Sequence, residues 1–141
     1  MTAATTRRIL ALGAISGMRS MAGAAALGAR HGGTMQAATA MLAAAEMVAD
    51  KTPYVGNRTD PLPQAGRAVM GAIVGGVIAA EHGESPWLGA FVGAAAAVVA
   101  THLAYRLRAR LPLSIPVGGL LEDAVVVGAG ALYVRRSRTA R

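Results

Sequence analysis

The chain has 141 residues, of which 54% are hydrophobic, 4% aromatic and 15% charged, and its formal net charge is +7. A water-soluble domain usually carries about 25% charged residues, so the composition favours a membrane domain. The absence of Cys excludes a disulfide framework, a thiolate metal site and a Cys nucleophile.

Apolar segments alternate with short polar or basic stretches along the whole chain. A helix of about 20 residues covers the hydrocarbon core of a bilayer at about 1.5 Å per residue. The sequence therefore predicts an all-α, polytopic membrane protein with four to five short transmembrane helices, forming one domain over residues 1–141 with short basic tails at 1–8 and 135–141. The predicted segments are Ile9–Ala29, Thr34–Lys51, Arg67–Glu81, Trp87–Tyr105 and Ser114–Val134.

The first and the last of these segments are interrupted. Arg19 lies near the middle of the first one. A polar loop with three Pro, Thr52–Gly66, separates the second segment from the third. The last segment contains Pro116 and the pair Gly118-Gly119. Residues 120–134 alone would reach only about 22 Å as a helix, so we expect this last segment to be broken or re-entrant.

The positions of the basic residues bear on topology. All but one of the 14 are Arg, and they cluster at the ends of apolar runs, whereas a nucleic-acid binder interleaves them with polar and aromatic residues. We therefore expect a lipid bilayer, the inner (plasma) membrane of the cell, as the surroundings, and no nucleic acid as partner. If the amino terminus is cytoplasmic and four segments cross, the clusters at 7–8, 51–67 and 106–110 all face the cytoplasm.

A fifth crossing would leave the basic residues 135–141 on the far side of the membrane. Either the last segment dips in and returns, or it crosses against the positive-inside tendency. The amino-terminal Arg7-Arg8 pair and the uncharged run after it also resemble a secretory or twin-arginine signal, although Arg19 within that run argues against one.

Glycines spaced by four occur in three of the predicted helices. Small residues one turn apart allow two helix backbones to approach closely in lipid, so we expect these positions to pack helices together, within one chain or in a homo-oligomer. They are Gly13, Gly17, Gly71, Gly75, Gly89 and Gly93.

Ionisable residues within the apolar segments are the candidate functional residues, because a charge at bilayer mid-depth costs about 2.5–3.5 kcal/mol or more unless it is paired or hydrated. We expect Arg19 to pair with Glu122 or Asp123, and Glu46 and Asp50 to cluster with Lys51 or Arg67. A buried pair of this kind serves either as an ion or substrate pathway or as a clamp between helices. The full set is Arg19, Glu46, Asp50, Lys51, Arg67, His102, Glu122 and Asp123.

Motifs of enzymes and cofactor sites are missing. The sequence has no phosphate-binding loop, no Gly-x-Ser-x-Gly elbow and no His-Glu-x-x-His motif. The Glu81-His82-Gly83-Glu84 turn offers too few ligands to predict a metal site. We expect no enzyme activity, no cofactor and no metal. Two functions remain: a small transporter or channel-like protein, or a structural or assembly subunit whose partner is another membrane protein.

The order of the charged motifs resembles a known family. Ser16-Gly17-Met18-Arg19-Ser20 is followed by Glu46-Met47-Val48-Ala49-Asp50-Lys51-Thr52-Pro53, then Gly66-Arg67, His102 and Glu122-Asp123. This order is similar to that of small bacterial integral-membrane proteins classed as the domain of unknown function numbered 4126, and the similarity covers about residues 13–130. The resemblance implies a polytopic membrane protein and implies no particular activity.

Overall fold

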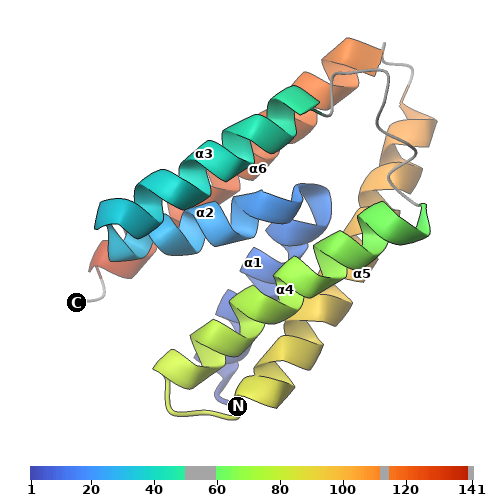
Figure 1. Cartoon of the computed structure of the whole chain (residues 1–141). Helices are drawn as coiled ribbons and strands as arrows, with labels where there is room; N and C mark the ends of the chain where they lie inside the picture. Colours follow the sequence, from blue (N-terminus) through green and yellow to red (C-terminus); the bar gives the residue numbers. More distant parts are fainter. Residues whose placement is uncertain (50–59, 112–114, 140–141) are drawn as a thin grey trace.

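The computed structural model describes residues 1–49, 60–111 and 115–139, and this part of the chain contains helices joined by short turns and no strands (Figure 1). This confirms the predicted all-α class. The helices are α1 (Ala3–Met18), α2 (Ser20–His31), α3 (Gly33–Ala49), α4 (Pro61–Glu81), α5 (Pro86–Arg110) and α6 (Ile115–Thr139).

Three segments of this described part are long and apolar enough to cross a membrane: α4, α5 and Val117–Arg136 within α6. The sequence led us to expect four to five crossings, and the length and composition of the described helices support three of them. α3 has 17 residues, which is close to the shortest helix that spans a bilayer.

Helices α4 and α5 both begin at a proline. Pro61 and Pro63 lie in the first turn of α4, and Pro86 begins α5 directly after Ser85, whose hydroxyl accepts a hydrogen bond from the Leu88 N–H. A proline is favourable in a first turn because the N–H that it lacks has no partner there in any case. The loop predicted up to Gly66 was therefore too long.

The first predicted crossing, Ile9–Ala29, is wrong as a continuous helix. The backbone of Arg19 is extended, with φ −142° and ψ 117°, and it separates α1 from α2. Gly13 of α1 packs on Gly93 of α5 and Gly17 packs on Ala97, so α1 runs parallel to α5. At the far end of α2, Arg30 forms a salt bridge with Glu81, the last residue of α4.

Because Thr2 also bonds to the α4–α5 turn, through Glu84, the start of α1 and the end of α2 lie at the same end of the bundle. Residues 3–31 thus enter the bundle, turn at Arg19 and return, and we call them the re-entrant hairpin. Its tip is opposite residues 97–101 of α5, near the middle of that helix.

The break expected in the last segment is also wrong. α6 is one helix of 25 residues that continues through Gly118 and Gly119. Pro116 is its second residue, a position where proline does not interrupt the hydrogen-bonding pattern, and glycine within a helix costs only about 1 kcal/mol relative to alanine. Neither residue type is therefore sufficient to break this helix.

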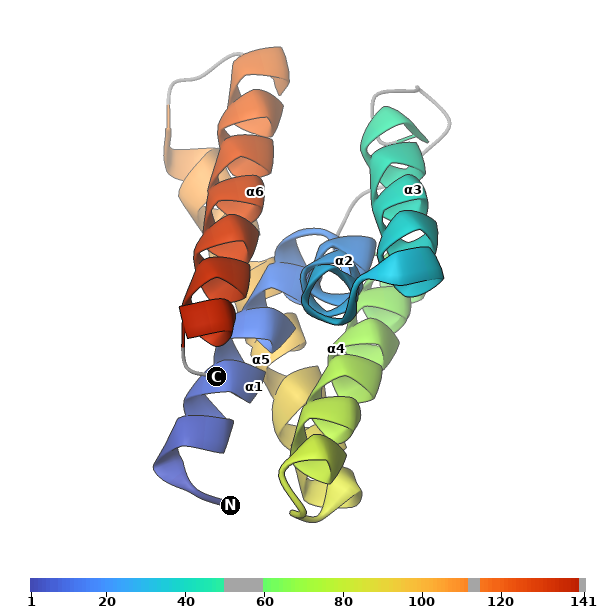
Figure 2. The same ribbon diagram turned by 90° about the vertical axis from the view of Figure 1, so that its left-hand side faces the viewer.

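The topology differs from the one expected because the returning segment is the first one. α3, α4, α5 and α6 then run alternately up and down, and the amino terminus and the carboxyl end of α6 lie at the end of the bundle that also holds the α4–α5 turn (Figures 1 and 2). Arg7 and Arg8 therefore lie at the opposite end from Arg106–Arg110, in contrast to the sequence expectation. Arg135 and Arg136, near the end of α6, share the end of Arg7 and Arg8.

Close glycine contacts join α1, α4 and α5. A Cβ atom on Gly93 would overlap the carbonyl oxygen of Gly71, and one on Gly75 would overlap that of Gly89. The six glycines singled out in the sequence all lie at contacts of this kind. The other helices are arranged differently, since α2 lies between α3 and α6 (Figure 2).

Replacing Gly93 by Ala should destabilise the protein, because the new methyl group forces α4 and α5 apart. Overpacking of this kind typically costs about 1–3 kcal/mol. Gly128→Ala is the matched control, since nothing lies within 4 Å of the corresponding Cβ position in α6. Thermal unfolding in detergent measures both variants. Equal melting temperatures for the two would contradict the close α4–α5 contact.

Candidate functional site

The break at Arg19 leaves backbone groups without their helical partners. In a continuous helix the N–H groups of Ser20 and Met21 would bond to carbonyl oxygens four residues earlier, among them that of Gly17. A buried backbone group without a partner is costly, and in hydrocarbon no water is available to replace it. The surroundings of the break must therefore supply hydrogen-bonding partners.

Glu46 of α3 supplies the acceptors. Its Oε1 accepts a hydrogen bond from the Ser20 N–H at 2.8 Å and one from the Ser20 hydroxyl, and its Oε2 accepts one from the Met21 N–H at 2.8 Å. A carboxylate is favoured at this position because the amino end of a helix carries a partial positive charge. The partner of Glu46 is thus the first turn of α2, in place of the basic side chain expected from the sequence.

Thr101 of α5 supplies the donor. Its hydroxyl lies 2.7 Å from the carbonyl oxygen of Gly17 and 2.9 Å from that of Ala97. The side chain is buried, and the contact is possible because Gly17 has no side chain to hold α5 away from α1. One threonine therefore satisfies one of the carbonyl groups that the break leaves open, that of Gly17.

Arg19 itself is turned toward α6. Its Nε donates to Oδ1 of Asp123 at 2.8 Å, and one of its terminal nitrogens lies 2.6 Å from the same oxygen. Only 2% of Arg19 is exposed. Of the two acids expected as partners, Asp123 is the one in contact, and it ties the tip of the re-entrant hairpin to α6.

Further charges lie on the helices around the break. Glu122 is 3.7 Å from Arg108 of α5, which agrees with the divergence of about 100° between neighbouring helical residues. Arg67 is 5% exposed and precedes Gly71, a residue in contact with α5, by one turn of α4. We call Arg19, Glu46, Arg67, Thr101, Asp123 and the Arg108–Glu122 pair the charged layer.

The two ends of the re-entrant hairpin are held by the α4–α5 turn. Glu81 binds Arg30 and His31, each at 2.8 Å, while Arg8 contacts Nε2 of His82. Because Nδ1 of His82 lies 2.8 Å from the Ile78 carbonyl oxygen and must donate to it, Nε2 is the acceptor for Arg8. The Thr2 N–H bond lowers the pKa of Glu84 below its ordinary value.

The other residues predicted as site members are placed differently. Asp50 and Lys51 lie outside the described residues. His102 is exposed and contacts Gln64 at 2.9 Å, so it lies beside the charged layer and not in it. Among the residues that the structure describes, no three His, Asp or Glu side chains are grouped so that they could hold a metal ion.

Sequence reasoning missed three participants: Ser20, Thr101 and Arg108. Ser20 is the first residue of α2, and its hydroxyl bonds to Glu46 and does not cap the helix, so the capping pattern of a helix start could not have identified it. Thr101 gives no signal either, because a threonine within an apolar helix is usually only a weakly polar packing residue. Its role depends on the closeness of Gly17.

Comparisons with protein-family models, with curated proteins and with solved structures find no match to this chain. The resemblance to the family described above therefore stays a prediction.

Arg19→Gln should strongly destabilise the protein, because it removes the buried guanidinium that pairs with the half-buried carboxylate of Asp123. Loss of one member of a buried pair typically costs about 3–5 kcal/mol. Arg19→Gln combined with Asp123→Asn should recover part of that loss, since the uncompensated charge is then removed. Unfolding in mixed detergent micelles measures the stability of Arg19→Gln, of Asp123→Asn and of the double variant. The exposed Arg106→Gln is the control. Strictly additive losses would argue against direct coupling.

Glu46→Ala should loosen the first turn of α2. The N–H groups of Ser20 and Met21 lose their acceptors, so their amide hydrogens should exchange faster with solvent. A buried donor left unsatisfied costs about 1–3 kcal/mol. Hydrogen-exchange mass spectrometry of a peptide that covers residues 18–24 reports this change, and Asp60→Ala at the start of α4 serves as control. Unchanged exchange would mean that Glu46 does not hold the break.

Proposed function

We propose that the chain is an integral membrane protein with four crossing helices, α3 to α6, and one re-entrant hairpin, and that it moves a small ion or polar solute past the charged layer. The observation that carries this proposal is the interrupted helix at Arg19, whose open backbone groups and guanidinium are held by side chains from three other helices. Interrupted helices at membrane depth typically line binding sites and pathways.

Exposed apolar side chains support the membrane location. Trp87, Leu62, Met41 and Phe91 are each more than 70% exposed, and they lie on three different helices. A soluble protein rarely exposes an apolar surface of this extent. Trp87 lies at the start of α5, where an indole ring would meet the lipid headgroups.

The basic residues support one orientation. The re-entrant hairpin brings Arg7 and Arg8 to the same end of the bundle as Arg135 and Arg136. We infer that this end is cytoplasmic, since these four residues and Arg30 outnumber the three basic residues that the structure describes at the other end, Arg106, Arg108 and Arg110. The arrangement removes the conflict that a fifth crossing would create.

The charged layer provides a physical basis for gating. Hydrogen bonds to Glu46, Asp123 and Thr101 hold the tip of the hairpin, and water or a polar solute that enters the break can replace them as partner. Displacement of these bonds would free the tip while its two ends stay anchored at the α4–α5 turn. The re-entrant hairpin is thus the moving element of the proposed pathway.

A second function is favoured by the same contacts. Each backbone group opened at Ser20, Met21 and Gly17 has a partner within the chain, as in a rigid scaffold. On this alternative the charged layer is a set of helix clamps, and the protein is a structural subunit of a membrane assembly.

Flux measurements separate the two functions. Liposomes that contain the protein, potassium chloride and a pH-sensitive dye should dissipate an imposed ion or proton gradient faster than protein-free liposomes. Asp123→Asn should change this rate at least about tenfold, because a shift of 1.4 kcal/mol in a barrier corresponds to tenfold, and Asp60→Asn should leave the rate unchanged. A wild-type rate equal to that of empty liposomes, with Asp123→Asn lowering only the stability, would favour the structural subunit.

A further inference from the structure

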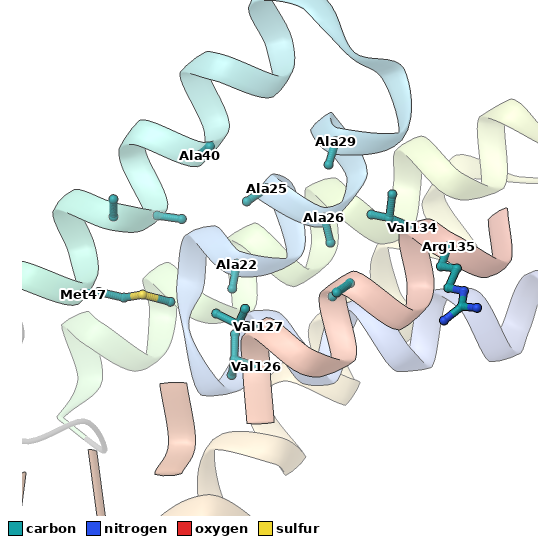
Figure 3. A pocket seen from close by; sticks show the side chains of 14 residues that line it. Ala22, Ala25, Ala26, Ala29, Ala40, Met47, Val126, Val127, Val134 and Arg135 are labelled. Carbon is teal, nitrogen blue, oxygen red and sulfur yellow. The ribbon is translucent and has the colours of Figure 1, made fainter. Parts of the chain in front are cut away.

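An apolar groove of about 720 Å³ opens along one side of the bundle (Figure 3). α2 forms its floor, and α3 and α6 form its walls. Small and aliphatic side chains line almost all of it, including Ala22 and Ala29 of α2, Ala44 and Met47 of α3, and Val126 and Val134 of α6. The groove is within the size range of small-molecule sites.

Among the residues that the structure describes, Arg135 is the only charged one that lines the groove. Along α6 the lining runs from Val126 to Arg135, nine residues or about 13 Å of helix. Val126 marks the inner end, one turn from Asp123 of the charged layer. Arg135 marks the outer end, near the carboxyl end of α6 and on the side of the molecule that holds the amino terminus. The groove is therefore apolar inside and cationic at its mouth.

We propose that this groove binds one anionic phospholipid of the surrounding membrane, with an acyl chain between α3 and α6 and the phosphate at Arg135. The groove follows α6, so a chain within it would lie along the direction of the crossing helices, and the guanidinium would stand at headgroup depth. Arginine binds phosphate oxygens through several N–H donors at once. This inference rests on the membrane location and is independent of transport.

A helix of a second copy complements the cationic mouth of the groove less well than an anionic headgroup does. α5, one of the two longest helices, contains no Asp or Glu, and neither do α1 and α2. The acids of α3, α4 and α6 are Glu46, Glu81, Glu122 and Asp123, and all four bind groups of their own chain. Charge complementarity thus favours a lipid phosphate.

Native mass spectrometry of the detergent-solubilised protein tests the proposal, with palmitoyl-oleoyl phosphatidylglycerol and the matching phosphatidylcholine as probes. The wild type should retain one phosphatidylglycerol per chain in preference to phosphatidylcholine. Arg135→Gln should reduce this preference about tenfold, as expected for the loss of one charge-assisted hydrogen bond. Arg136→Gln, the neighbouring arginine outside the lining, is the charge control and should keep the preference.

Ala44→Phe tests the apolar part of the groove. It places a ring between α3 and α6 and should reduce retention of phosphatidylglycerol about tenfold. Ala45→Phe is the matched control, because Ala45 is equally exposed on α3 but does not line the groove. Equal retention of the two lipids by the wild type, or equal behaviour of Arg135→Gln and Arg136→Gln, would overturn the proposal. Loss of a dimer in Ala44→Phe with unchanged lipid binding would assign the groove to a second copy.

Discussion

The arrangement of the helices depends on hydrogen-bonding partners for the backbone groups at one interrupted helix. Where the chain turns at Arg19, the N–H groups of Ser20 and Met21 and the carbonyl groups of Ser16 and Gly17 lose one another as helical partners inside an apolar bundle. Glu46 accepts from the two N–H groups, and Thr101 donates to the carbonyl group of Gly17. Since each such group would otherwise carry a desolvation cost, α3 and α5 are fixed in position relative to the tip of the re-entrant hairpin.

The two kinds of contact in the bundle have different roles. Between α1, α4 and α5, glycines bring backbones into direct contact, and this part has little room for rearrangement. α2 is held by polar bonds at its two ends and by buried residues such as Ala26 and Leu27 along its length, and one side of it lines the groove between α3 and α6. The ion pairs and carboxylate contacts of α2 are the ones that a change in protonation or hydration would act on. This asymmetry underlies both proposals made for the protein.

The groove and the charged layer are neighbours, since Val126 at the inner end of the groove is one turn from Asp123. A lipid chain in the groove would shield this end of the charged layer from the rest of the bilayer. Arg19 and Asp123 would then meet water only along the interior of the bundle. The lipid would thus maintain the low dielectric that strengthens the Arg19–Asp123 interaction, without taking part in transport.

The sequence by itself determined the helical class and the approximate positions of α3 to α6, because long apolar runs leave few alternatives in lipid. It also indicated that Arg19 needs an acid near Glu122 or Asp123, and that the spaced glycines pack helices. The direction of the chain after Arg19 was decided only by the tertiary structure. The chain is interrupted at Arg19, between α1 and α2, whereas Pro116, Gly118 and Gly119 do not interrupt α6. The difference lies in the side chains that surround each position. Glu46 and Thr101, distant in sequence, supply partners for an open turn at Arg19, and local sequence carries no information about partners that the fold brings from 26 and 84 residues away.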